Sequence, residues 1–149
     1  MSKKIYLLAL SMFLLNVVNA QILNPVKWTF AAKKLNDKEA VIFMKATIDK
    51  GWHMYSQNMG EGGPIPTKFT FSPSKTHSIN GKTIEPKSTT SYEKVFSMNV
   101  SYFDKEVIFQ QRIKLNSATT TIKGTVEFMA CDDTQCTPPT EVNFAIQVK

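Results

Sequence analysis

The sequence has very few cysteines and no sustained helical pattern. Among its 149 residues there are only two cysteines, two histidines and six glycines. A single cysteine pair excludes a dense disulfide framework, and a chain of this length can bury a core without one. After the first twenty residues there is no long apolar run, so the sequence predicts no membrane span there. No phosphate-binding glycine motif, Ser/His/Asp pattern or paired-carboxylate signal is recognisable.

The first twenty residues have the organisation of a secretory signal peptide. Lys3 and Lys4 form a positive start, Ile5–Leu15 forms an apolar stretch, and cleavage is predicted after Ala20. The apolar stretch is too short for a stable membrane span. We therefore expect an exported domain made of residues 21–149, periplasmic or secreted, in a compartment that permits disulfides.

The charge of the chain is mildly positive and scattered. The formal net charge is +6, two of the positive charges lie in the predicted leader, and the other lysines stand among acidic residues. A solvated surface is the ordinary interpretation of such a pattern. Export further argues against a nucleic-acid partner.

The exported part has the pattern of an all-β protein. Strands are expected over Val26–Phe30, Val41–Ile48, Phe69–Phe71, Val95–Phe103, Val107–Leu115, Ile122–Phe128 and Val142–Val148. Most of these segments alternate apolar and polar residues, and turn residues separate them, which predicts a sandwich or a barrel. Gly60–Pro66 contains three glycines and two prolines and is therefore expected to be an irregular loop.

The two cysteines, Cys131 and Cys136, lie near the C-terminal end between two expected strands. The intervening Asp132–Gln135 suits a tight turn, because Asp and Thr side chains bond to nearby backbone groups. A tight turn can bring two cysteines within disulfide distance. Pro138 and Pro139 stiffen the exit and mark the start of an edge strand.

Three interpretations of this pair remain open from the residues alone. A structural staple would constrain little of the unfolded chain, because its loop is shorter than the fifteen-residue loop that gives ~3 kcal/mol. The chain would then be a secreted binding or adhesion module with Gly60–Pro66 as its contact surface. A redox centre would instead exchange with a partner's thiolate, although Asp132 and Asp133 disfavour a thiolate nearby. A zinc site would need His53 and His77, which lack the paired spacing of zinc motifs.

Three segments resemble those of a known family. An apolar strand leads to Cys131, an acidic turn follows, and Cys136–Glu141 begins with a Cys-x-Pro-Pro segment. Gly51–Ser56 is similar to the family's Gly-aromatic-aromatic-x-Tyr segment, and Tyr92–Phe96 stands where the family carries a cap loop. The family is the N-terminal periplasmic domain of the thiol:disulfide interchange protein DsbD. The resemblance covers nearly all of residues 21–149.

This resemblance implies an immunoglobulin-like antiparallel β-sandwich with the redox cysteine pair in a C-terminal hairpin. It also implies an electron relay, and so a protein-disulfide reductase component that needs no cofactor or metal and does not insert into the membrane. The thioredoxin-like domain of a DsbD-type membrane reductase would reduce the chain. The chain would then reduce oxidised thioredoxin-fold proteins of the periplasm, such as disulfide isomerases and cytochrome-maturation factors.

The resemblance also implies a role for five residues. Cys136 would be the cysteine that partners attack, and Cys131 would resolve the mixed disulfide. Phe96 would be the aromatic cap that covers the disulfide until a partner displaces it. Tyr55 and His53 would line the site.

The chain departs from the family pattern at three places. Four residues separate the cysteines, where the best-known members have five. Lys94 and Val95 precede Phe96, where the family has acidic residues. His53 occupies a position at which the family has a tyrosine, so no proton-transfer role is assigned to it. Because of these differences, the resemblance does not imply how partners are recognised or how the reactivity of the two thiols is set.

Overall fold

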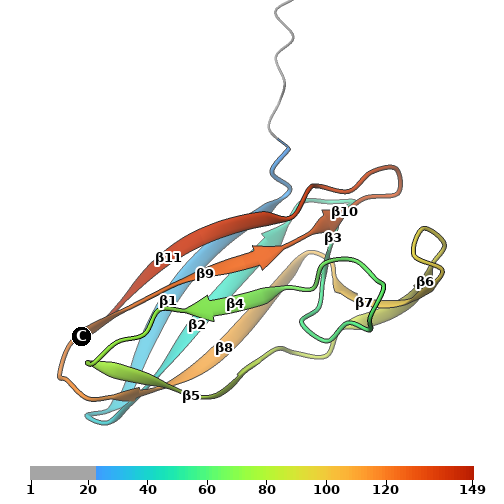
Figure 1. Cartoon of the computed structure of the whole chain (residues 1–149). Helices are drawn as coiled ribbons and strands as arrows, with labels where there is room; N and C mark the ends of the chain where they lie inside the picture. Colours follow the sequence, from blue (N-terminus) through green and yellow to red (C-terminus); the bar gives the residue numbers. More distant parts are fainter. Residues whose placement is uncertain (1–22) are drawn as a thin grey trace, which may run out of the picture.

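The structure is a computed structural model that describes residues 23–149 (Figure 1). The expected signal peptide and its cleavage site lie outside the described residues. Within the described range every regular element is a β-strand and none is a helix. The search for a helix of sufficient length and hydropathy to cross a bilayer, made over these same residues, finds none.

Eleven strands follow one another between residues 23 and 149. They are β1 (Val26–Asn36), β2 (Glu39–Ile48), β3 (His53–Tyr55), β4 (Lys68–Phe71), β5 (His77–Ile84), β6 (Thr89–Glu93), β7 (Met98–Phe103), β8 (Glu106–Leu115), β9 (Thr120–Phe128), β10 (Ala130–Cys131) and β11 (Thr140–Val148). All the strand pairings are antiparallel. The expected all-β class is confirmed.

Two sheets face each other as an immunoglobulin-like sandwich. One has the strand order β1-β2-β8-β5 and the other β11-β9-β4, while a third sheet, β10-β3-β7-β6, extends one end of the molecule. Figure 1 shows the C-terminus at the opposite end from the hairpins that carry β6 and β10. Strand β11 is an edge strand, as the two prolines before it predict.

The interior between the two sheets follows from alternation along the strands. In β8 every second side chain is buried, from Val107 through Phe109 to Leu115, and β9 has the same pattern. Side chains at alternate positions of a strand share one face, so this pattern places a mainly apolar surface inward. Trp28 of β1 packs against Phe109, with ring centroids 5.9 Å apart. We call this interior the sandwich core.

A second, smaller group of packed side chains lies at the cysteine end. Its buried members are Tyr55, Val100 and Cys131, and the partly buried Met59, Phe96, Met98, Tyr102 and Met129 pack against them. We call these eight residues the cysteine-end cluster. Its buried members come from β3, β7 and β10, which are strands of the third sheet.

One close approach in the sandwich requires glycine. A Cβ atom built on Gly124 would lie 2.3 Å from the backbone oxygen of Thr70 and 2.7 Å from Cζ of Phe144. Both are well inside van der Waals contact. Gly124 therefore lets β4 and the Phe144 ring approach β9 from two sides.

The structure corrects several expectations about the strands. Strand β1 continues to Asn36 and does not end at Phe30. The strand expected over Val95–Phe103 begins only at Met98, because the chain reverses direction at Lys94–Ser97 to pair β6 with β7. Ser97 has a φ of 53°, and its amide donates to the Lys94 carbonyl at 3.2 Å. Strands β3 and β10 were not expected, since they are only three and two residues long. Strands β5 and β6 were not expected either, since most of their side chains are exposed. Such strands show no alternation to detect.

The buried amide of Gln111 explains how β5 stays attached despite its irregular register. The pairing of β5 with β8 shifts between Asn80 and Ile84, where Gly81 has a φ of 74°. Gln111 Nε2 donates to the carbonyls of Asn80 at 3.1 Å and Gly81 at 3.3 Å. Its oxygen accepts from the Thr83 hydroxyl at 2.8 Å. A polar side chain is tolerated in the core because its bonds are satisfied.

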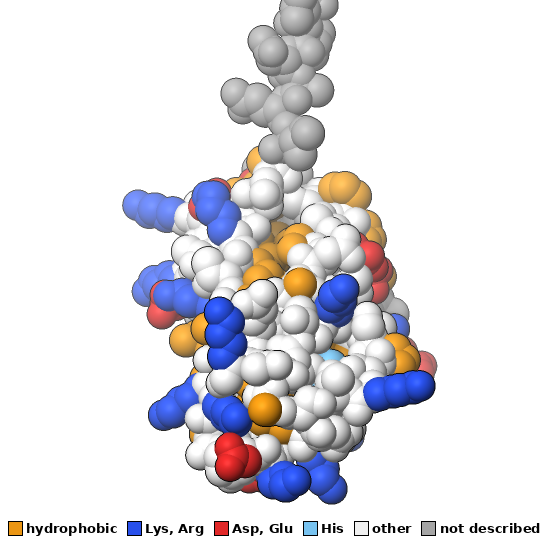
Figure 2. Space-filling view, turned by 90° about the vertical axis from the view of Figure 1, so that its left-hand side faces the viewer, with side chains coloured by type: hydrophobic (Ala, Val, Ile, Leu, Met, Phe, Trp, Pro, Cys, Tyr) orange, Lys and Arg blue, Asp and Glu red, His pale blue; other side chains and the backbone are white. Residues whose placement is uncertain are grey.

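The surface agrees with the scattered charge of the sequence. Figure 2 shows lysine and arginine side chains spread over one face of the molecule, with acidic side chains among them and no single basic patch on that face. This face offers no argument for a polyanionic partner.

Candidate functional site

The two cysteines form a disulfide where β9 and β11 come together. Cys131 and Cys136 face each other in an isolated antiparallel bridge, with Cα atoms 4.0 Å apart and the sulfurs bonded. Strands β9 and β11 pair along nine positions, and the pairing nearest the cysteines joins Phe128 to Thr140. The expected hairpin is confirmed. Cys131 is 2% exposed, whereas Cys136 is exposed to solvent.

The turn between the cysteines is held by one carboxylate. Asp132 Oδ1 accepts hydrogen bonds from the Thr134 amide at 2.8 Å, the Thr134 hydroxyl at 2.9 Å and the Gln135 amide at 2.8 Å. The bond from the Thr134 amide is the main reason that the pKa of Asp132 lies below its usual value. Asp and Thr therefore build the turn locally, as the sequence predicts.

The chain after Cys136 is tied back to the strand before Cys131. Thr137 is 4% exposed, its amide donates to the Ala130 carbonyl at 2.7 Å, and its hydroxyl accepts from the Ala130 amide at 3.2 Å. Both bonds stay within the hairpin. They fix the backbone on each side of the disulfide without using the sulfurs.

The short strand β3 brings two of the expected site residues to the disulfide. It lies between β10 and β7, with His53 opposite Cys131 and Tyr55 opposite Tyr102. Tyr55 is fully buried, and His53 is half-buried. The His53 ring also lies 4.9 Å, centroid to centroid, from the Tyr102 ring.

A carboxylate that the sequence interpretation missed joins this group. Glu93, the last residue of β6, has Oε1 2.8 Å from His53 Nε2 and Oε2 3.0 Å from the Tyr55 hydroxyl, which donates to it. Burial raises the pKa of Tyr55 well above its ordinary value, and the bond to Glu93 raises it further. Tyr55 therefore acts here as a donor that keeps its proton.

Phe96 lies on the turn that follows Glu93. Its ring packs against the cysteine-end cluster and meets the Tyr55 ring edge-on at 6.2 Å. Its neighbour Val95 is 84% exposed. The turn therefore presents one aromatic ring inward and one apolar side chain outward.

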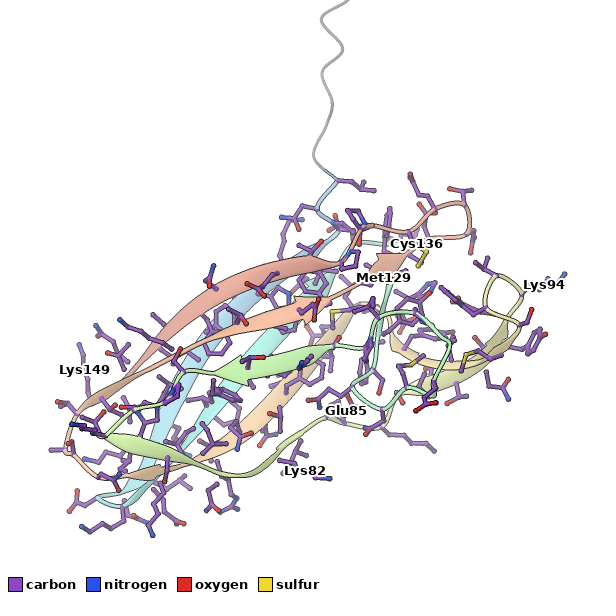
Figure 3. The ribbon with its side chains drawn as sticks, viewed as in Figure 1. Lys82, Glu85, Lys94, Met129, Cys136 and Lys149 are labelled. Atoms are coloured by element: carbon purple, nitrogen blue, oxygen red, sulfur yellow. A yellow bond between two sulfur atoms is a disulfide. The ribbon has the colours of Figure 1, made fainter. Side chains whose placement is uncertain are left out.

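A pocket of about 360 Å³ separates this turn from the cysteine hairpin. It is lined by His53, Glu93, Lys94, Val95, Phe96 and the whole segment Cys131–Cys136. Figure 3 shows Lys94 and Cys136 on neighbouring hairpins at the same end of the molecule. The pocket is large enough to admit a partner's side chain to the disulfide.

The structure thus gathers four of the five expected residues around one pocket and places the fifth behind it. Both cysteines, Phe96 and His53 line the pocket, and Tyr55 is buried beneath it with its hydroxyl on Glu93. The missed Glu93 stands 38 residues from Tyr55 in the chain. Its only sequence signal was its place in the segment that resembles the family's cap loop.

The zinc interpretation of the cysteines finds less support. Among residues 23–149, no three side chains from His, Cys, Asp and Glu are grouped as a metal site would need. His77 instead bonds through Nδ1 to the Thr120 hydroxyl at 2.9 Å. The irregular Gly60–Pro66 loop is confirmed. Its Gly63 lies close to Met98, because a Cβ there would be 3.0 Å from Sδ of that residue, whereas Ile65 of the same loop is 37% exposed.

Similar folds occur among solved structures. The N-terminal periplasmic domain of ScsB from Proteus mirabilis is 19% identical, with a TM-score of 0.63, over 83% of this chain and 46% of that one. The chain thus spans about half the length of that structure. The reduced N-terminal domain of Neisseria meningitidis DsbD is 16% identical, with a TM-score of 0.52, over 80% and 84%.

A third structure contains a complex. It holds the N-terminal domains of DsbD and PilB from Neisseria meningitidis and is 15% identical, with a TM-score of 0.54, over 84% of this chain and 87% of that one. At these identities the three similarities establish the fold. A comparison with curated proteins finds no match. The family described as thiol:disulfide interchange protein DsbD, N-terminal, matches residues 19–147, and the chain therefore belongs to this family of thiol–disulfide exchange domains.

Proposed function

We propose that the chain is a periplasmic relay that passes electrons between proteins through its Cys131–Cys136 disulfide. Its donor would be the thioredoxin-like domain of a DsbD-type membrane reductase, and its acceptors would be oxidised thioredoxin-fold proteins of the periplasm. Residues 21–149 would be the exported domain, released by cleavage after Ala20. The observation that carries this proposal is the unequal exposure of the two cysteines beside the pocket: 2% for Cys131, against an exposed Cys136.

The unequal exposure of the two cysteines supports a different role for each. A thiolate of the donor attacks Cys136 Sγ, the disulfide breaks, and Cys131 leaves as a thiolate that takes up a proton. The donor's second thiolate then attacks the donor's first sulfur in the mixed disulfide. This step releases Cys136 as a thiolate. Two electrons have moved to the chain, and the donor leaves with a disulfide.

Delivery to the acceptor runs in the opposite direction. The Cys136 thiolate attacks the acceptor's disulfide and forms a mixed disulfide, releasing one acceptor thiolate. Cys131 then attacks Cys136 Sγ, which restores the disulfide of the chain and releases the second acceptor thiolate. Each exchange consumes one disulfide and forms another, so no cofactor is needed.

Phe96 would act as a cap in this relay, with Tyr55 and His53 lining the site. The support is its position: it sits on a turn of four residues, packs against the cluster that contains Cys131, and borders the pocket through which Cys136 is reached. A partner that enters the pocket has to displace this ring or slide past it.

Redox titration against glutathione and dithiothreitol tests the relay against the structural alternative. A structural disulfide of a secreted binding module has a potential below about −300 mV, and an exchange-active one lies higher. We expect a potential above that limit and full reversibility. A bond that stays oxidised at the glutathione poise, in a folded protein, would favour the binding module.

Single-cysteine variants test the division of roles. Cys131→Ala leaves the exposed Cys136, which should form a stable mixed disulfide with an oxidised thioredoxin-fold protein, visible on a non-reducing gel. The matched variant Cys136→Ala leaves only the buried Cys131 and should form far less. Equal yields from the two variants would show that exposure does not choose the attacking sulfur.

A further inference from the structure

The charge around the disulfide is opposite in sign to the charge of the whole chain. The chain has 18 basic and 12 acidic residues and a formal net charge of +6. Three carboxylates and one lysine line the cysteine pocket: Glu93, Asp132, Asp133 and Lys94. The other basic residue of its lining is His53, so the acidic side chains outnumber the basic ones whether or not that imidazole is protonated. The pocket is therefore an acidic cleft in a basic domain.

The carboxylates of the pocket lack the lysine partners that other acidic residues have. Among residues 23–149, no lysine or arginine forms a salt bridge with a carboxylate of the pocket. Elsewhere, three carboxylates lie 2.7–3.4 Å from a lysine amine: those of Asp37, Asp49 and Glu106. The amide of Thr134 lowers the pKa of Asp132, which keeps that carboxylate charged. The negative charge of the pocket is thus not cancelled by the lysines of the domain.

The disulfide determines what has to enter this acidic cleft. Cys136 is exposed and lines the pocket, and exchange requires an outside sulfur to reach bonding distance of Cys136 Sγ. The groups that flank that sulfur then come close to the side chains of the pocket. A cleft lined by one sign of charge attracts ions of the opposite sign and speeds their association. A cation beside the incoming sulfur is therefore favoured, and an anion there is repelled.

We propose that the cysteine pocket selects protein partners that present a lysine or arginine side chain beside their reactive sulfur. This inference rests on the proposed function, because it names the partner chemistry for the same disulfide. The partner's cation serves both directions of the relay. It offsets the repulsion between the pocket and a donor's thiolate, and it draws an acceptor's disulfide toward the Cys136 thiolate. Complementary charge of this kind sets specificity and association rate more than affinity.

Asp133 and Lys94 are the positions at which this selection can be altered. Both are exposed and line the pocket, so Asp133→Asn removes one negative charge and Lys94→Gln removes one positive charge. The other two carboxylates are less suitable, because Asp132 holds the cysteine turn and Glu93 accepts from the Tyr55 hydroxyl. Substitution of either would change the structure as well as the charge.

Asp37 supplies a matched control at the other end of the domain. Its carboxylate lies 3.4 Å from Lys34 Nζ, and the same amine donates to the Ala118 carbonyl at 3.3 Å. Ala118 precedes β9, whose opposite end leads to Cys131. Asp37→Asn changes the net charge by the same amount as Asp133→Asn but lies outside the pocket.

The test uses three symmetric disulfides with one carbon skeleton and different charges. They are dicationic cystamine, uncharged 2-hydroxyethyl disulfide and dianionic bis(2-sulfonatoethyl) disulfide. All the proteins carry Cys131→Ala, so Cys136 is the single thiol. Its thiolate attacks one sulfur of the probe, forms a mixed disulfide and releases the other half as a thiolate. Mass spectrometry follows the added mass.

The quantity compared is the selectivity, which is the rate with cystamine divided by the rate with the dianion. A change in the thiolate fraction of Cys136 cancels in this ratio. At about 10 mM ionic strength, Asp133→Asn should lower the selectivity about threefold and Lys94→Gln should raise it about threefold, as fits single charges in a solvated cleft. Asp37→Asn should leave it unchanged. At about 1 M salt the Debye length shrinks to ~3 Å, and the variants should become alike.

Equal selectivities in Asp133→Asn and Asp37→Asn would overturn the proposal. A change of the same sign in Asp133→Asn and Lys94→Gln would overturn it too, because the two substitutions shift the charge in opposite directions. Where thermal unfolding shows that Asp133→Asn does not fold, the Lys94→Gln selectivity decides alone.

This experiment also separates the charge selection from the relay. The probes need no protein partner, so charge-dependent selectivity in a chain whose native disulfide fails the redox titration would refute the relay and keep the selection. Flat selectivity in a chain that exchanges reversibly would refute the selection alone.

Discussion

The two packed clusters of this domain are built on different principles. The sandwich core joins long, alternating strands, and most of its members, such as Phe109 and Ile122, are fully buried and apolar. The cysteine-end cluster has three buried members, and the others are partly exposed methionines and aromatic residues. Two of its strands, β3 and β10, are only three and two residues long. Polar contacts from Glu93 to His53 and Tyr55 connect β3 to the β6–β7 hairpin.

This difference separates stability from reactivity. Burial of large apolar side chains supplies most of the free energy of folding, so the sandwich core can hold the fold while the cysteine end rearranges. Segments with few buried apolar contacts open at low cost in free energy, and flexible Met98 and Met129 can refill space when Phe96 moves. A strongly packed cysteine end would resist the displacement that partner access demands.

The largest expected effect comes from the sandwich core. Phe109→Ala removes a fully buried ring that contacts Trp28, Phe69 and Phe103, and should lower the free energy of unfolding by about 3–5 kcal/mol. Urea unfolding of the oxidised protein measures it. Where this variant is too unstable to study, Phe109→Leu should cost about 1 kcal/mol. In the folded variant the rate of disulfide reduction should stay near that of wild type, and a large change there would show that the two clusters are coupled.

A smaller change in stability, with a larger change in reactivity, is expected at the other cluster. Phe96→Ala truncates a half-buried ring and should lower the free energy of unfolding by about 1 kcal/mol, while small thiols should reduce the disulfide several times faster. Val95→Ala is the control, because that side chain is 84% exposed on the same turn. Reduction of Phe96→Ala at the wild-type rate would remove the proposed cap.

The smallest effect concerns His77, at the end of the sandwich away from the cysteines. Burial lowers the pKa of His77 below its ordinary value, so between the folded and unfolded pKa values the unfolded chain binds more protons. The free energy of unfolding should therefore fall as pH drops below about 6.5 and level off below the folded pKa. His77→Gln should lose less stability than wild type between about pH 7.5 and pH 5, measured by urea midpoints. Equal losses of stability in wild type and His77→Gln would show that His77 is not the cause of the pH dependence.

The sequence could predict the strands of the sandwich core but not the exposed ones. Alternation in Ile122–Phe128 and Val142–Val148 is strong because one face of each strand is buried. In β5 and β6 both faces are largely exposed, so no periodicity identifies them. Val95 begins the strand expected over Val95–Phe103, yet it stands on the turn of a hairpin, where its exposure reflects tertiary pairing that no local pattern contains.

The candidate site was predictable where its signal was local. Cys131 and Cys136 are the only cysteines in the chain, so they could be picked out directly. The residues of the turn between them indicate the hairpin. Glu93 has no such signal, because its partners lie 38 and 40 residues away and meet it only through the β3–β7–β6 pairing. The unequal exposure of the two cysteines likewise depends on which of them faces β3.

The pairing of β9 with β11 has one more consequence. Nine cross-strand pairs end beside the cysteines, and the Thr137–Ala130 contacts close the backbone around them. When the sulfur–sulfur bond breaks, this strand pairing and these backbone contacts keep the two thiols close together. Held in this way, each thiol meets the other at a far higher local concentration than any molecule in solution can reach. The reduced hairpin remains ready to close again as soon as one sulfur is captured by another protein.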